Sequence, residues 1–181
     1  MPGDVGCHRN HNDCLCGLYG TGKILEDRGC GMKKDFSMLS DYAEELFAAG
    51  FSQKKVYEHI LMEFYGTPYI YGRQSPDGSD CSGSVCSAMS LATGKNVRVT
   101  ADTLFKDFFT EDVKIFNKES FLYAAFFLDE NGKAVHVSGW SLGMFMNVSR
   151  REPGQKGNWR TEAELRRLYP HLLMIKRGMK I

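Results

Sequence analysis

Residues 66–94 read GTPYIYGRQSPDGSDCSGSVCSAMSLATG and predict a loop followed by a helix. The first half is rich in glycine, proline and serine, which is typical of a loop. From Cys81 onward, apolar residues recur at helical spacing, namely Val85, Ala88, Met89 and Ala92. Gly94 predicts the end of this helix. Cys81 is therefore expected at a helix N-terminus, where unpaired N–H groups and the helix dipole stabilise a thiolate.

The second cysteine of this helix, Cys86, has the features of a buried structural residue. Five helical residues rotate a side chain by roughly 500°, or about 140° net, so Cys86 points away from Cys81 into the packing face. A disulfide between the two is geometrically poor. Burial without reactivity is the common fate of a free cysteine, and the position at the start of a helix is what distinguishes Cys81.

Helices are predicted before this stretch and strands after it. Apolar residues at helical spacing predict two helices, one ending before Gly50 (Leu39, Tyr42, Leu46, Phe47) and one between Ser52 and Gly66 (Val56, Tyr57, Ile60, Leu61, Phe64). Apolar runs predict strands over 121–128, 134–140, 144–149 and 172–177, and a capping box predicts a short helix over 161–168. This order predicts an α+β fold, with N-terminal helices packed on an antiparallel β-sheet.

Length and charge exclude several classes of protein. The 181 residues, 43% of them hydrophobic, are enough for one folded domain and exclude disorder as the main state. Lys plus Arg at 23 against Asp plus Glu at 22 leave a net charge of +1, so we expect no nucleic-acid partner. The longest apolar stretches are far below the ~18 residues that cross a bilayer, so no membrane association is expected. The basic residues Arg150, Arg151, Lys156 and Arg160 fit a solvated loop and contact with an anionic wall equally well.

A thiolate mechanism needs a histidine to take and return the proton, and a third group to hold that histidine. Of the five histidines, only His136 lies within a predicted strand. Its neighbours Val135 and Val137 point to the opposite face of the sheet. A core histidine bonded to a backbone carbonyl is the alternative interpretation.

The predicted hairpin of strands 134–140 and 144–149 brings a polar partner to His136. If the hairpin is centred between Ser141 and Leu142, directly opposed residues have numbers that sum to 283, which pairs His136 with Asn147. Their Cβ atoms would then lie roughly 5 Å apart. An odd-length turn would move Asn147 to the other face, so the pairing depends on the turn.

These segments resemble the NlpC family of papain-like bacterial cell-wall cysteine peptidases. The match rests on Gly66-Thr-Pro-Tyr-Ile-Tyr-Gly72, Ser75-Pro-Asp-Gly78, Asp80-Cys-Ser-Gly83, and His136-Val137 followed eleven positions on by a polar residue. It covers about residues 52–180 and departs from the family pattern at Arg73, Ser79 and Ser138, among other positions.

The resemblance implies a papain-like NlpC-type domain that needs no cofactor for catalysis. It assigns Cys81 as the nucleophile, His136 as the general base and Asn147 as the orienting residue. Tyr69 matches the family tyrosine beside the nucleophile. Asp80 and Ser82 match residues that, in some members, hold the amino end of the peptide substrate.

The implied function is that of a cysteine endopeptidase, a thiol protease that hydrolyses amide bonds in the stem peptides of peptidoglycan. Two alternatives stay open: a papain-like acyltransferase or amidase for another substrate, and a structural particle component with a vestigial site. The first residues show no apolar segment of an export signal, although a wall hydrolase acts outside the cytoplasm. Delivery by a phage particle, as a phage tail protein or injected lysin, is one solution, and a signal already removed is another. We favour the first, with other phage tail proteins as partners.

The amino-terminal segment, residues 1–35, differs from the predicted peptidase domain over 36–181. It is rich in glycine and asparagine, and contains Cys7, Cys14, Cys16 and Cys30 together with His8 and His11. Thiolates and imidazoles are the ligands of structural zinc, but the cysteine spacing is not a standard zinc signature. A zinc site or iron–sulfur centre at the four cysteines, two disulfides, and free thiols are the alternatives.

Overall fold

The computed structural model describes residues 35–181, so all but the last residue of the predicted amino-terminal segment lies outside the described part. The helices are α1 (Phe36–Ala48), α2 (Gln53–Met62), α3 (Cys81–Thr93), α4 (Ala101–Thr103), the π-helix η2 (Leu104–Phe108), the 3-10 helix η3 (Pro153–Gln155) and α5 (Glu162–Leu168). The strands are β1 (Gln74–Ser75), β2 (Gly78–Ser79), β3 (Glu111–Asp112), β4 (Phe121–Leu128), β5 (Ala134–Ser141), β6 (Met144–Asn147), β7 (Asn158–Arg160) and β8 (Leu173–Lys180). Among residues 35–181, no helix has the length and apolar character needed to cross a membrane.

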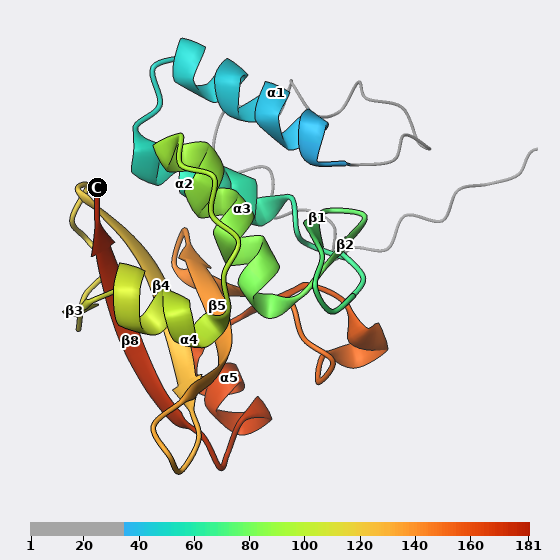
Figure 1. Cartoon of the computed structure of the whole chain (residues 1–181), viewed down its shortest axis with the longest axis vertical. Coiled ribbons are helices and arrows are strands. Elements are labelled where there is room, and N and C mark those ends of the chain that lie inside the picture. Colours follow the sequence, from blue (N-terminus) through green and yellow to red (C-terminus); the bar gives the residue numbers. More distant parts are fainter. Residues whose placement is uncertain (1–34) are drawn as a thin grey trace, which may run out of the picture. The chain divides into compact units, whose positions relative to one another are not determined.

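The predicted α+β architecture is confirmed. Six strands form one antiparallel sheet in the order β3-β8-β4-β5-β6-β7. Helices α1, α2 and α3 lie together beside this sheet (Figure 1). β4 matches its predicted bounds, whereas β3 and β7 were not predicted because two or three residues are too few to show a strand period.

The predicted helix boundaries follow from side-chain caps. The Ser52 side chain accepts from the Lys55 N–H at the start of α2, and Thr161 with Glu164 forms a complete capping box at the start of α5. Gly94 ends α3 in the left-handed region, with φ of 72°, which costs glycine little. Phe47 was expected on the apolar face of the first helix, but it is 41% exposed.

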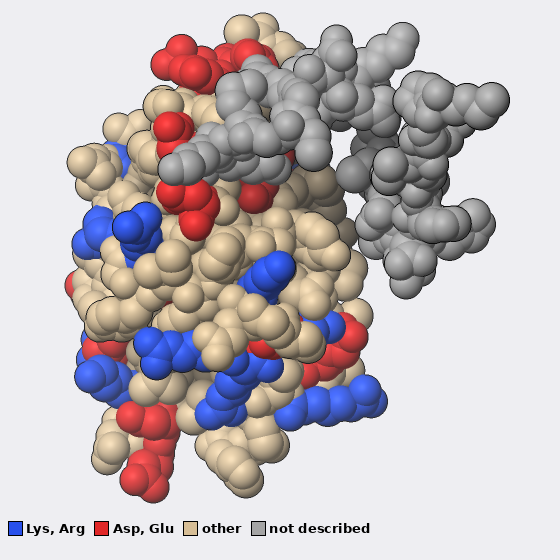
Figure 2. Space-filling model, turned by 90° about the vertical axis from the view of Figure 1, so that its right-hand side faces the viewer, with Lys and Arg blue, Asp and Glu red and all other residues tan. Residues whose placement is uncertain are grey.

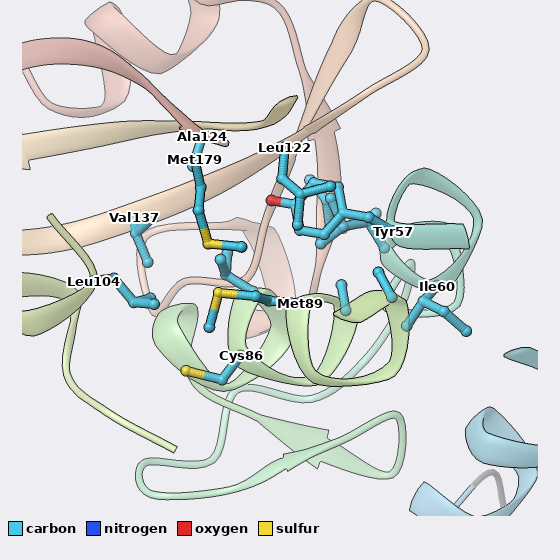
Figure 3. Close-up of a cluster of buried hydrophobic side chains, with 14 of the residues drawn as sticks. Tyr57, Ile60, Cys86, Met89, Leu104, Leu122, Ala124, Val137 and Met179 are labelled. Carbon is cyan, nitrogen blue, oxygen red and sulfur yellow. The ribbon is translucent and has the colours of Figure 1, made fainter. Parts of the chain in front are cut away.

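β4 is buried on both faces, which explains its uninterrupted apolar sequence. On one face, Leu122 and Ala124 pack in the main core with Tyr57 of α2 and Met89 of α3 (Figure 3). On the other face, Ala125 and Phe127 belong to a second cluster with Phe145 of β6, Leu165 of α5, Tyr169 just after α5, and Met174 of β8. The sheet is therefore the middle layer between two groups of side chains.

The β5–β6 hairpin has a different register from the predicted one. Ser141 pairs with Met144 and Gly139 with Met146, so paired residues sum to 285 and not to 283. The turn is Leu142-Gly143, and both residues have positive φ, as in a type I′ turn. The predicted direct opposition of His136 and Asn147 is therefore wrong. A shift of two in the sum leaves both side chains on the same face, because side chains alternate with a period of two.

The loop before α3 is fixed against the first turn of that helix. The Asp80 N–H donates to the Arg73 carbonyl at 3.0 Å, and a Cβ added at Gly83 would lie 2.1 Å from the same carbonyl oxygen. Gly83 therefore lets the loop approach α3 closely, beside Cys81.

We predict that Gly83→Ala destabilises the fold by about 1–3 kcal/mol, because the added methyl group forces the loop away. In an unobstructed helix the same change stabilises by roughly 0.5–1 kcal/mol, so the sign of the effect tests the packing. Urea denaturation measures it. A midpoint that is unchanged or raised would show that the loop is not held against α3.

Candidate functional site

Cys81 is the first residue of α3, as predicted. Asp80 is the N-cap residue in an extended conformation, and its Oδ1 accepts from the Gly83 N–H at 2.7 Å. Cys81 is a free cysteine that is partly exposed as a residue, whereas Cys86 is a free cysteine fully buried in the core. The two cysteines thus differ in environment as the helical spacing indicated.

The sulfur of Cys81 lies against the edge of β5. The Val137 backbone N–H points to the thiol and opposes the effect of burial, which is the largest influence and raises the Cys81 pKa to about 11. The paired residues of β5 and β6 begin only at Gly139, so the stretch of β5 that carries His136 and Val137 extends beyond this pairing. The sequence neighbour of His136 is therefore in contact with the candidate nucleophile.

His136 and Asn147 form a hydrogen bond, although they are not directly opposed. The His136 Nε2 and Asn147 Oδ1 atoms are 2.6 Å apart, within reach of diagonal neighbours on one sheet face. Ser138 donates to the same Asn147 oxygen at 2.8 Å. Burial lowers the His136 pKa to about 4, so the ring is neutral at pH 7. On this side of the ring, His136 contacts side chains and not the backbone carbonyl that the alternative interpretation requires.

Tyr169 is a site residue that the sequence did not indicate. Its ring stacks on His136 with centroids 4.6 Å apart, and its hydroxyl lies 2.9 Å from His136 Nε2. The hydroxyl donates to Ser149 Oγ at 2.7 Å. Burial raises the Tyr169 pKa to about 12, so the phenol is protonated at neutral pH. Tyr169 follows Leu165 by one helical turn, a spacing that is indistinguishable from ordinary core packing.

A buried ion pair was also missed. Glu152 accepts from Asn147 Nδ2 at 2.6 Å and from Arg160 Nε at 3.0 Å. Its hydrogen bonds to Arg160 raise the Arg160 pKa. The interpretation of Arg160 as part of a solvated loop or wall contact is therefore wrong, since its side chain is only 19% exposed and bound to Glu152. Polar residues eight positions apart give no periodic signal of such a pair.

The residues predicted to contact substrate lie around Cys81. Tyr69 forms an isolated β-bridge with Ser79, two residues before Cys81, and burial raises the pKa of its phenol. The Arg150 guanidinium lies over the Tyr69 ring, 5.2 Å from its centroid. Asp80 and Ser82 both bond Arg98, with 2.8 Å from Arg98 Nη2 to Asp80 Oδ2 and 3.0 Å from Nη1 to Ser82 Oγ.

Charges of both signs are mixed on one face of the molecule. Figure 2 shows Lys and Arg side chains across the lower half of this face, with Asp and Glu side chains near them and in a group toward the top. A surface of this kind has no extended field of one sign for a polyanion. It agrees with the net charge of +1.

No group of three or more potential metal ligands occurs within residues 35–181. The cysteines predicted to hold zinc or an iron–sulfur centre, Cys7, Cys14, Cys16 and Cys30, lie outside the described residues. The metal prediction is therefore confined to the amino-terminal segment and does not involve the Cys81 site.

Comparison with known proteins identifies the fold. No protein-family model and no curated protein matches the sequence. The structure is similar to the NlpC/p60 domain of the peptidoglycan hydrolase SagA, with 17% sequence identity and a TM-score of 0.52 over 71% of this chain and 98% of that one. It also matches NlpC1 from Trichomonas vaginalis, with 22% identity and a TM-score of 0.49 over 68% of this chain and 44% of that one. The likeness to the SagA domain confirms the predicted NlpC-type fold.

The depressed His136 pKa predicts a specific loss of stability in acid. Between pH 6.5 and about 4 the unfolded chain binds a proton that the folded chain excludes, so the stabilisation is complete above pH 6.5 and is lost as the pH falls through 4. From pH 7 to pH 4, the wild-type free energy of unfolding should therefore fall by about 3 kcal/mol more than that of His136→Gln. Urea denaturation at both pH values measures this, and equal losses in the two proteins would contradict it.

Proposed function

We propose that this protein is a cysteine peptidase that hydrolyses an amide bond in the peptide part of peptidoglycan. The observation that carries the proposal is the position of the Cys81 thiol, at a helix N-terminus and against β5, where His136 is bonded to Asn147. Nucleophile, base and orienting group are the three parts that amide hydrolysis by a thiol requires. The substrate class is supported by the fold shared with a domain of a peptidoglycan hydrolase.

The two reacting groups start as a neutral thiol and a neutral imidazole, because burial raises the Cys81 pKa and lowers the His136 pKa. In the proposed mechanism, His136 takes the thiol proton as the sulfur attacks the amide carbonyl carbon. Backbone N–H groups at the start of α3 stabilise the oxyanion. His136 then gives its proton to the leaving amine, and a thioester of Cys81 remains.

Water completes the reaction. His136 accepts a proton from the attacking water molecule, the oxygen bonds to the thioester carbon, and the carbon–sulfur bond breaks. The sulfur leaves as a thiolate and recovers its proton from His136, so the free enzyme is regenerated together with a carboxylic acid. The virion as a delivery route and phage tail proteins as partners stay predictions from the sequence.

We predict that Cys81→Ser retains the fold and loses activity by about a thousandfold or more, because serine lacks a comparably accessible anion. Cys86→Ser is the matched control. It puts a more strongly hydrated hydroxyl at a buried position, where the thiol donates to the Val99 carbonyl at 3.6 Å, so it should lower stability and leave turnover of the folded protein nearly unchanged.

Digestion of purified muropeptides, with mass spectrometry of the products, measures the activity of both variants and identifies the amide bond that is cut. New amino ends that depend on Cys81 would support a peptidase. Acyl transfer to an acceptor other than water, or no turnover by the wild type, would contradict the proposal.

Tyr69 and the buried residues Asp80 and Ser82 are proposed to bind the substrate peptide beside the scissile bond. The sequence resemblance assigns the substrate's amino end to Asp80 and Ser82. In the structure, the two Asp80 oxygens already accept from four donors: the Gly72 N–H, the Gly83 N–H, Ser82 Oγ and Arg98 Nη2. A carboxylate accepts about four hydrogen bonds, so a substrate ammonium group would have to displace Arg98.

We therefore predict that wild-type protein cuts a peptide with an acetylated amino end at least as fast as the same peptide with a free amine. In Arg98→Met, the ratio of kcat/KM for the free over the acetylated peptide should rise about tenfold, because the ammonium group can take the vacated place. Arg73→Met is the control, since the Arg73 side chain is exposed and pairs with Asp77 instead. An unchanged ratio in Arg98→Met would show that Asp80 does not bind the amino end of the substrate.

A further inference from the structure

The contact between Glu152 and Asn147 has no role in the mechanism above. Glu152 lies just after β6, with a fully buried side chain, and its Oε1 accepts from Asn147 Nδ2 at 2.6 Å. Arg160 donates to both carboxylate oxygens, from Nε at 3.0 Å and 3.1 Å. A carboxylate paired with an arginine accepts hydrogen bonds and donates none.

This contact determines which way the Asn147 amide faces. An amide has a donating nitrogen end and an accepting oxygen end, and exchanging them requires only a rotation of the group. The Glu152 carboxylate accepts only, so it selects the nitrogen end. The oxygen end is left for His136 Nε2 at 2.6 Å and for the Ser138 hydroxyl at 2.8 Å.

The amide orientation in turn determines where His136 carries its proton. Because the Asn147 oxygen accepts only, the bond to it requires a proton on Nε2. Tyr169 points to the same assignment, since its hydroxyl proton is directed to Ser149 and its lone pairs therefore face Nε2. Nδ1 is then unprotonated, and is the only ring nitrogen that can take a proton from a thiol.

We propose that Glu152, held by Arg160, is a positioning residue that sets the tautomer of His136 through the Asn147 amide. With Glu152 in place, the neutral ring carries its proton on Nε2 and is a base at Nδ1. Without it, the amide is free to rotate and to present its nitrogen end, which favours the tautomer with no base at Nδ1. This inference deepens the proposed thiol mechanism and rests on it, but the tautomer is measurable without any substrate.

The first measurement is NMR of the wild-type protein labelled with 15N-histidine, with the His136 signals assigned by their loss in His136→Gln. We expect a pyrrole-type Nε2 and a pyridine-type Nδ1. The reverse pattern in the wild type would overturn the proposal whether or not any variant folds.

The second measurement uses Glu152→Gln, whose side-chain amide no longer selects one end of Asn147. We expect a signal from the tautomer protonated on Nδ1, and a fall in the rate of Cys81 alkylation by iodoacetamide at pH 7 that matches its fraction, about tenfold where it makes up about 90% of the ring, because only the remainder can assist thiol ionisation. Mass spectrometry of the peptide that contains Cys81 separates its reaction from those of the other cysteines.

Glu164→Gln is the matched control. Glu164 also faces Arg160, at 3.7 Å, but is partly exposed and does not bond Asn147, and glutamine keeps the capping box. This variant should keep the wild-type tautomer and alkylate within about twofold of the wild-type rate. If Glu152→Gln does not fold, Glu152→Leu combined with Arg160→Met removes both charges, and the same fall is expected.

A Glu152 variant with the wild-type tautomer and alkylation rate would overturn the proposal, and so would an equal fall in Glu164→Gln. A third outcome is that the wild type shows the expected tautomer, that Glu152→Gln loses it, and that the wild type does not cleave muropeptides. This outcome would support the positioning role and count against the substrate proposal alone.

Discussion

The carboxylate of Asp80 joins three parts of the chain, and the geometry around Cys81 depends on it. One oxygen caps α3 and accepts from Ser82, and the other accepts from the Gly72 N–H and from Arg98. The loop, the helix N-terminus and the segment after α3 thus share one charged group. An ionised acceptor near the positive end of a helix is favoured by the dipole, which adds to the stability of the cap. Burial is the main cause of the raised Cys81 pKa, and the same negative charge adds to it, so the group that positions the thiol also opposes its ionisation.

The polar cluster next to His136, formed by Asn147, Glu152 and Arg160, is not explained by a gain in the stability of the fold. Burying an ion pair such as Glu152 and Arg160 costs desolvation energy that the attraction often fails to offset, and well-packed apolar residues are frequently as stable. The His136 ring is likewise kept neutral by burial, which lowers the free energy of unfolding in acid. Such costs are common where a site needs fixed hydrogen bonds, because a rigid network defines orientations that an apolar contact leaves free. The cluster also joins β6, β7 and the end of α5, which gives the last third of the chain a direct part in the site.

The sequence predicted those features that have a strong local signal. Cys81 was placed because a loop signal ends where a helical period begins, and β4 because it is apolar throughout. The sequence predicted the correct sheet face for Asn147, although it predicted the centre of the turn one residue too early. Gly143, and not Leu142, is the second residue of the turn. Tyr169 and the Glu152–Arg160 pair were missed because their roles depend on contacts between distant segments. No period in the sequence separates a tyrosine that stacks on a histidine from one that fills a core.

The β5–β6 register has a consequence for recognising such sites in other sequences. His136 and Asn147 meet because they lie on one face of a hairpin, not because a fixed number of residues separates them. Residues added to or removed from the turn change the number of residues between the two positions and leave the ladder pairs intact, whereas one residue inserted within a strand exchanges the faces beyond it unless a bulge compensates. The shared sheet face of the two residues is therefore the property that selection can hold constant while the length of the turn varies. Searches that require an exact spacing between the two residues would pass over chains in which the pair is intact.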